Sequence, residues 1–381
     1  MQRILRLSKS DISKKEIRYV SQVLNKEYLG MGPETFKFEK ELESFFNRKV
    51  LCSSSGTSAL HLALQACGIK TGDEVIAPTI TYVATYQAIT ATGAKVVFCD
   101  VEQDTLCISI KDLKKKITSR TKVIIPVHIG GHPCDLEQIY KIAKKNKLRV
   151  IEDSAHAFGS FYHKKKIGSF GDISCFSFDG IKNITSGEGG CVVTNDKKIL
   201  KKISDARVLG VEGESKKKYL KSRSWDFDVK EQGWRYHLSD LNAAIGRAQL
   251  KRFKKFSNIR QNLAKQYDKI IKKNNYKKKE IEIFKRDFTK EVPHIYYVLI
   301  KKLKFRDKLR QDLLEKKNIQ TGIHYFPGYK LSYFKKKKFY SNTEKIYKKI
   351  LTLPLHTNLK KQNINYIIKS LFYLLKSKKY Y

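Results

Sequence analysis

Residues 173–194 read ISCFSFDGIKNITSGEGGCVVT, and this stretch decides the fold class. Its two apolar runs, 173–178 and 190–194, have the length of buried strands and enclose a polar, glycine-rich loop. Similar apolar runs precede it at residues 74–77, 95–99, 122–128 and 148–152. Between them the sequence shows helical periodicity, and several runs are too apolar for a sheet with one exposed face. The pattern therefore predicts an α/β protein built on a mostly parallel sheet.

The pattern changes in the last third of the chain. A long helix is predicted from residue 239 to about 271, and Lys-rich segments with short β-like runs such as 295–300 follow. The chain ends in an amphipathic helical pattern at 364–375. We therefore expect a large domain at residues 1–250, which includes an N-terminal segment, and a smaller α+β domain at residues 251–381.

The charge of the chain is uneven. Among 381 residues, 78 Lys and Arg stand against 37 Asp and Glu, a formal net charge of +41, and most of the excess lies in residues 201–381. Lysine dominates although arginine is the better ligand for bidentate base and phosphate recognition, so nucleic-acid binding is not favoured. The lysine runs are expected to be solvated surface: Lys216–Lys218, Lys277–Lys279 and Lys335–Lys338.

The seven cysteines are scattered, with no C-x-x-C pair, and most lie in apolar patterns. We expect reduced, buried thiols and no metal site. The first ten residues lack the apolar core of a signal peptide, and no stretch approaches the roughly 18 apolar residues of a membrane span. A soluble cytoplasmic protein is therefore expected.

Residues 53–58, Ser-Ser-Ser-Gly-Thr-Ser, lead directly into a predicted helix at 58–66. Small hydroxylated residues and a glycine at a helix N-terminus present free N–H groups and the positive end of the helix dipole, which suits a phosphate. Ordinary capping needs only one Ser or Thr and is the alternative.

Asp153 and His156 follow the predicted strand at 148–152. The carboxyl ends of parallel strands face the crevice in which α/β proteins bind ligands, so Asp153 is a candidate functional residue. A carboxylate that merely caps the next helix is the alternative.

Lys182 stands alone among uncharged neighbours in the loop after residue 178. Partial burial would lower its pKa and make it a candidate for Schiff-base formation. An exposed surface lysine is the alternative.

A phosphate cradle, an acid and a lone lysine follow one another along the chain. In this order of motifs the sequence resembles the PLP-dependent nucleotide-sugar aminotransferases of the DegT/DnrJ/StrS family. The resemblance covers nearly the whole chain and is carried by residues 28–33, 55–64, 72–78, 152–157 and 182–190, with a weaker match at 353–355. It implies a fold type I aminotransferase with a mostly parallel sheet in the large domain. It also implies a homodimer in which both chains build each active site.

The resemblance implies a role for each matching residue. Lys182 would hold pyridoxal 5'-phosphate (PLP) as an internal aldimine and move the proton, and Asp153 would keep the pyridine nitrogen protonated. Other cofactor contacts implied are stacking by Tyr82, a hydrogen bond from His156 near the phenolic oxygen, and phosphate contacts from Gly56, Thr57, Ser58 and Ser177. For Tyr82 an ordinary core aromatic is the alternative.

Some positions depart from the family pattern. Arg235 stands where many relatives have an Asn that reaches the phosphate from the neighbouring subunit, and we expect it to make this contact; a structural ion pair is the alternative. Asp179 and Gly130 replace residues of other types and are expected near the sugar. Further substrate contacts are expected from Gly30, Glu188, His324 and Tyr325, although residues 322–327 could also be an ordinary loop.

The predicted reaction has two halves. L-Glutamate converts PLP to PMP, which then aminates the 3- or 4-keto group of a nucleotide-diphosphate-linked deoxysugar for polysaccharide or glycoside biosynthesis. Three alternatives remain. One is a carbocyclic ketone as acceptor. Another is a PLP-dependent sugar dehydratase, which Lys182 disfavours because such relatives carry His there. The third is a basic DNA-binding regulator, which would bind with steep salt dependence.

Overall fold

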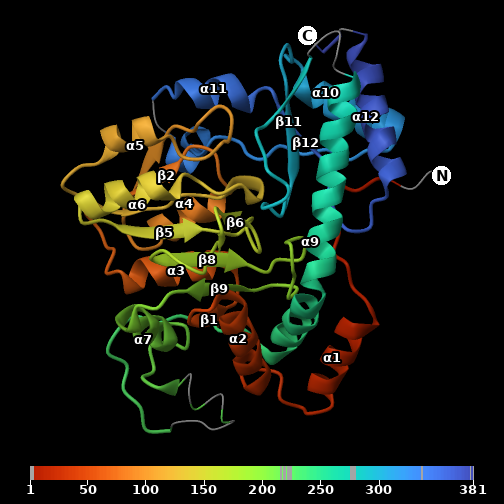
Figure 1. Ribbon diagram of the computed structural model, residues 1–381. Helices are drawn as coiled ribbons and strands as arrows, with labels where there is room; N and C mark the ends of the chain where they lie inside the picture. Colours follow the sequence, from red (N-terminus) through yellow and green to blue (C-terminus); the bar gives the residue numbers. More distant parts are fainter. Residues whose placement is uncertain are drawn as a thin grey trace.

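The computed structural model consists of a seven-stranded sheet covered by helices, a three-stranded sheet beside it, and one long helix that runs along both (Figure 1). It describes residues 4–380 except 215–216, 218–219, 221–224, 275–279, 336–337 and 378. The larger sheet has the order β1-β9-β8-β5-β4-β2-β3. These strands are β1 (Val50–Ser53), β2 (Glu74–Pro78), β3 (Lys95–Cys99), β4 (Thr121–Ile124), β5 (Arg149–Asp153), β8 (Ile173–Ser177) and β9 (Gly190–Val193).

The five strands from β3 to β8 are parallel, whereas β9 runs antiparallel to both of its neighbours. Successive side chains point to opposite faces, so each strand supplies two apolar cores. In β2, Val75 and Ala77 join the core under α3 (Gly56–Ala66), α4 (Val83–Thr90) and α7 (Lys197–Ala206). Ile76 joins the opposite core under α5 (Ile110–Lys116) and α6 (Leu136–Lys145). Burial on both faces explains the continuous apolar runs of the sequence.

The structure confirms the predicted α/β class and most predicted strands. β4 is shorter than the predicted run at 122–128, because Pro126 has no N–H to donate to a sheet ladder. The helix predicted at 58–66 begins at Gly56, where Ser55 is the N-cap. Two further helices, α1 (Lys14–Leu24) and α2 (Pro33–Phe46), precede the sheet, and a small hairpin, β6 (Phe161–Tyr162) and β7 (Lys165–Lys166), follows β5.

The three-stranded antiparallel sheet holds the C-terminal core. It consists of β10 (Ile281–Ile283), β11 (Tyr296–Ile300) and β12 (Ile350–Leu353), and α10 (Arg306–Lys317) and α12 (Lys361–Leu375) pack with it. α11 (Ser341–Tyr347) lies nearer the larger sheet. The long helix α9 (Asp240–Asn274) connects the two parts, so the boundary expected at residues 250/251 falls inside one continuous helix. The division into two domains stays a prediction.

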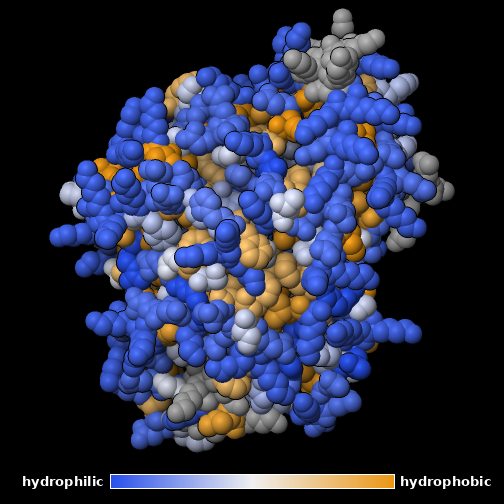
Figure 2. Space-filling view, viewed as in Figure 1, coloured by the Kyte–Doolittle hydropathy of each residue, from blue (hydrophilic) through white to orange (hydrophobic). Residues whose placement is uncertain are grey.

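Surface features fit the composition. The seven cysteines are all free, and six of them are buried. Hydrophilic residues cover most of the face shown in Figure 2. Lys335 and Lys338 are exposed, as expected for solvated surface. The run Lys277–Lys279, together with Lys216, Lys218, Lys336 and Lys337, lies outside the described residues. Within the described parts of the chain, no helix has the length and apolar character needed to cross a bilayer.

Candidate active site

A cavity of about 400 Å³ lies at the carboxyl ends of β5 and β8, between the two sheets. Its volume is within the range of small-molecule sites. The cavity brings together many of the residues predicted from the sequence. These are Gly56, Thr57, Tyr82, Asp153, His156, Ser177, Asp179, Lys182, Glu188, His324 and Tyr325.

The N-terminus of α3 forms one end of the cavity. Ser55 and Ser58 cap the helix reciprocally, since each hydroxyl accepts the backbone N–H of the other, at 2.9 and 3.0 Å. The N–H groups of Gly56 and Thr57 have no acceptor among the described residues and are available to an anion. A Cβ atom on Gly56 would lie 2.7 Å from Ser177 Cβ, so only glycine lets the helix approach β8 this closely.

Asp153 is the last residue of β5 and is buried. Its Oδ2 accepts the Thr85 hydroxyl at 2.8 Å, and its Oδ1 accepts the N–H of Ala155 at 3.2 Å. Burial raises the pKa of the Asp153 carboxyl, while these hydrogen bonds and the charge of Lys182 oppose the rise. The result is a fixed carboxylate that faces the cavity from its floor.

Lys182 projects into the cavity from the loop between β8 and β9. Burial lowers the pKa of this lysine from 10.5 to about 8, although the carboxylates of Asp179 and Asp153 favour the charged form. No hydrogen bond from a described residue holds its Nζ atom, so the amine is free to react. The alternative of an exposed surface lysine is therefore excluded.

The opposite wall belongs to segments next to the three-stranded sheet, and its ionisable groups are neutral. His294 precedes β11, and burial lowers its pKa well below the usual range. Burial lowers the pKa of His324 to about 4, and its Nδ1 lies 2.9 Å from Thr352 Oγ1. Tyr325 also lies here, and burial raises the pKa of its hydroxyl.

His156 joins the two walls. Its Nε2 lies 3.0 Å from the Tyr325 hydroxyl, and burial lowers its pKa far below the usual value. Tyr82, the N-cap residue of α4, lines the mouth with its side chain 58% exposed. Its ring centroid is 5.7 Å from that of Tyr325, so Tyr82 is not a core aromatic.

Several predicted site residues lie outside the cavity of this single chain. Ser58 is buried, and its hydroxyl accepts the N–H of Ser55 in the helix cap. Gly30 is exposed, and its carbonyl accepts the N–H of Asp240 at 2.8 Å. Arg235 is exposed and forms no ion pair with a described residue, against the structural ion-pair alternative. Gly130 does not line the cavity, but its N–H donates to Nδ1 of the lining residue His156.

Sequence reasoning missed three residues of the site. Ser55, which precedes the predicted phosphate-binding residues Gly56 and Thr57, also lines the cavity. Thr85 orients Asp153 from α4, and His294 contributes a ring to the wall, with its centroid 4.4 Å from that of His156. Thr85 lies three positions after Tyr82, one helical turn, and this spacing could have revealed it. No local pattern marks His294.

Comparisons with known proteins agree with this geometry. The model of the DegT/DnrJ/EryC1/StrS aminotransferase family matches residues 10–372. The chain belongs to this family. Its relatives include the GDP-perosamine synthase of Escherichia coli O157:H7, 38% identical over 94% of both chains. Another is the UDP-4-amino-4,6-dideoxy-N-acetyl-beta-L-altrosamine transaminase of Campylobacter jejuni, 34% identical over 98% of both chains. Among solved structures, the PLP form of Streptococcus pneumoniae Spr1654 is 28% identical, covers 98% of this chain and 99% of its own, and has a TM-score of 0.89.

Membership of the DegT/DnrJ/EryC1/StrS family makes the chain a PLP-dependent transaminase of fold type I. The residues present fit that cofactor. The free N–H groups at Gly56 and Thr57 suit its phosphate, Asp153 suits a protonated pyridine nitrogen, and Lys182 offers an unbonded amine of lowered pKa.

Proposed function

We propose that the protein transfers an amino group from L-glutamate to a 3- or 4-keto group of a nucleotide-diphosphate-linked deoxysugar. The general activity in this proposal, amination of nucleotide sugars, agrees with the two named relatives, which are a GDP-sugar and a UDP-sugar enzyme. The single observation that carries the proposal is Lys182, a half-buried amine of lowered pKa that shares one cavity with the buried carboxylate of Asp153.

Lys182 would hold the cofactor and move a proton at the substrate carbon. A pKa of about 8 allows this amine to exist in both protonation states near neutral pH, which a group that alternately accepts and donates a proton requires. PLP, when bound, supplies the electron sink that stabilises negative charge at the substrate carbon. Asp153 would stabilise the positive charge on the pyridine nitrogen, and Thr85 and Ala155 keep its oxygens in place.

The proposal includes a second chain at each site. Of the described residues that line the cavity, Lys182 is the one Lys or Arg, whereas Asp179 and Glu188 add negative charge at the same cavity. Glutamate and a diphosphate are both anions, so further cations are needed to bind them. Arg235, which is exposed and has no ion pair with a residue in the described part of the chain, is the proposed contribution of a second copy. Cytoplasmic location is part of the same proposal.

The direct test is spectroscopic. L-Glutamate is added to the PLP-loaded protein, and the visible absorbance of the cofactor is expected to decrease. Nucleotide-linked 3-keto and 4-keto sugars are then screened for the return of that absorbance, with Lys182→Ala as the negative control. An unchanged spectrum would exclude glutamate as the donor. Turnover of an inosose but of no nucleotide sugar would favour the carbocyclic alternative.

The shared site is tested by mixing subunits. Lys182→Ala and Arg235→Ala homodimers are each expected to be inactive or weakly active. Their random mixture should regain about a quarter of wild-type activity, because half the dimers are mixed and one of their two sites is intact. A mixture no more active than its components would contradict the contribution of Arg235 from a second chain.

A further inference from the structure

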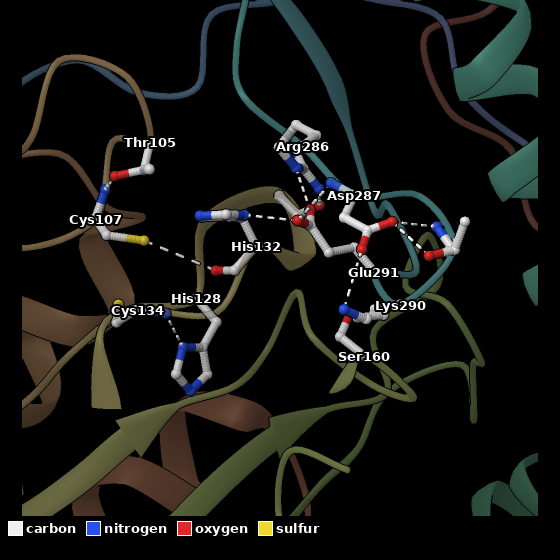
Figure 3. A network of polar contacts seen from close by, with 12 residues as sticks. Thr105, Cys107, His128, His132, Cys134, Ser160, Arg286, Asp287, Lys290 and Glu291 are labelled. Carbon is white, nitrogen blue, oxygen red and sulfur yellow. Dashed lines mark hydrogen bonds and ion pairs between the residues drawn. The ribbon is translucent and has the colours of Figure 1, made fainter. Parts of the chain in front are cut away.

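Arg286 connects the segment before β11 with the loop behind the active site. It belongs to the loop after β10, and its buried side chain forms an ion pair with Glu291. Glu291 also accepts His132 Nδ1 at 2.8 Å and the N–H of Asp287 at 2.9 Å, so its carboxylate is fixed from several sides (Figure 3). This leaves the Arg286 guanidinium in one orientation, with Nη2 donating to the carbonyl of Gly130 at 2.9 Å.

Gly130 is the residue that makes this contact possible. Its φ is +61°, and a Cβ atom there would lie 2.7 Å from Tyr297 Cε1 and 3.2 Å from Arg286 Nη1. The Gly130 carbonyl also accepts the N–H of His294 at 3.2 Å. Two donors therefore hold the carbonyl, and the N–H of the same residue points at His156 Nδ1 at 3.2 Å.

This hydrogen bond decides where His156 carries its proton. A backbone N–H can only donate, so Nδ1 must offer a lone pair. Burial keeps the imidazole neutral by lowering its pKa, so the single ring proton resides on Nε2. Nε2 lies 3.0 Å from the Tyr325 hydroxyl, which must then accept. The proton of Tyr325 remains free to donate elsewhere in the cavity.

A second histidine shows the same arrangement without an arginine. His128 Nδ1 accepts the N–H of Cys134 at 3.1 Å (Figure 3). Its Nε2 lies 2.9 Å from Glu152 Oε2. There a carboxylate fixes the tautomer from the other side. His156 has no carboxylate at Nε2 among its described contacts, so the tautomer depends on the Nδ1 side alone.

We propose that Arg286 is a positioning residue that, through Gly130, holds His156 as the Nε2–H tautomer and so keeps a hydrogen-bond donor directed at the cavity. Only the use of that donor rests on the proposed function. When Nε2–H donates to the Tyr325 hydroxyl, the tyrosine proton is free for an oxygen of a bound cofactor or substrate, whereas the reverse tautomer would itself accept that proton.

The test reads the tautomer in the cofactor-free protein. Long-range ¹H–¹⁵N spectra of protein labelled with ¹⁵N-histidine distinguish protonated from unprotonated ring nitrogens. Wild-type His156 is expected as Nε2–H, and Arg286→Met as a mixture of tautomers. His128 is the internal reference and should not change. The matched control is Arg149→Met, which removes a bidentate bond to Asp172 at the opposite end of β5.

Three outcomes would overturn the proposal: a wild-type His156 protonated on Nδ1, an unchanged His156 in Arg286→Met, or equal changes at His128 and His156. If Arg286→Met does not fold, Arg286→Gln replaces it, since its amide can still meet Glu291 but is too short to reach Gly130. In Arg286→Gln, a mixture of His156 tautomers supports the proposal, and a His156 tautomer unchanged from the wild type overturns it.

The loaded enzyme provides a second readout. Arg286→Met and Tyr325→Phe are each expected to lower kcat about tenfold, the loss expected for one hydrogen bond. The double variant should lose no more than about tenfold, because both substitutions remove the same donor. Additive losses would contradict the connection through His156. A complete lack of transamination in the wild type would refute the proposed function and leave the tautomer result intact.

Discussion

The two walls of the cavity differ in chemical character. The wall from the seven-stranded sheet carries Asp153 and Lys182, which can hold charge, beside the free N–H groups of α3. The wall next to the three-stranded sheet carries His294, His324 and Tyr325, and burial keeps all three neutral. We therefore propose that proton transfer and charge stabilisation belong to the first wall and that the second orients the substrate.

The largest effect is expected from Lys182 on the charged wall. Lys182→Ala should lower turnover at least about 10³-fold, because it removes the amine that is proposed both to hold the cofactor and to carry the proton. Turnover and cofactor absorbance are measured together. The matched control is Lys166→Ala: burial also lowers the pKa of Lys166, but its Nζ bonds to the carbonyl of Phe45, away from the cavity. Equal losses of turnover in Lys182→Ala and Lys166→Ala would contradict a specific role of Lys182.

Asp153 should rank second. Asp153→Asn keeps the shape of the side chain but removes the charge, and turnover should fall about 10²- to 10³-fold. Thr85→Val removes one hydrogen bond to that carboxylate and should cost about tenfold. Steady-state kinetics of both variants check the order. A greater loss in Thr85→Val than in Asp153→Asn would show that Thr85 acts by another route.

In the cofactor-free protein, the charge of Lys182 on this wall should lower the free energy of unfolding. Because the pKa of Lys182 is about 8 in the fold and 10.5 when exposed, the unfolded chain binds more protons between these values, and stability rises with pH there. Below about pH 8 the buried charge costs about 3 kcal/mol. Denaturant unfolding of Lys182→Met at pH 7 should show a gain approaching that amount, and the gain should shrink toward pH 10.5. A gain independent of pH would point to packing instead.

The neutral wall should give the smallest effect. His324→Ala should raise KM for the keto sugar about tenfold and change kcat little, because a neutral wall residue contributes binding shared by ground and transition states. Since the pKa of His324 is about 4, the activity profile between pH 6 and 8 should keep its shape. If the pH–activity profile of this variant lost an ionisation near pH 6.5, His324 would instead take part in proton transfer.

The two walls of the cavity also differ in how well the sequence predicts their residues. Lys182, Asp153 and residues 55–57 lie in short motifs whose spacing reflects strand ends and a helix start, so local sequence reveals them. Ser58 takes part in reciprocal capping with Ser55 in the single chain, so its predicted phosphate contact stays a prediction. His294 and Arg286 follow no local rule, since both contact Gly130, which lies more than 150 residues earlier in the chain.

The sequence by itself determined the α/β class, the positions of most buried strands along the chain and the family, because periodicity and ordered motifs are local properties of the chain. It also located the lone lysine between two apolar runs. Only the tertiary structure decided that burial would bring this lysine to a pKa of about 8 and that a neutral wall would face it. These properties depend on desolvation and on hydrogen bonds between distant segments, such as those that join Arg286, Gly130 and His156. Such contacts exist only once the two sheets have packed together.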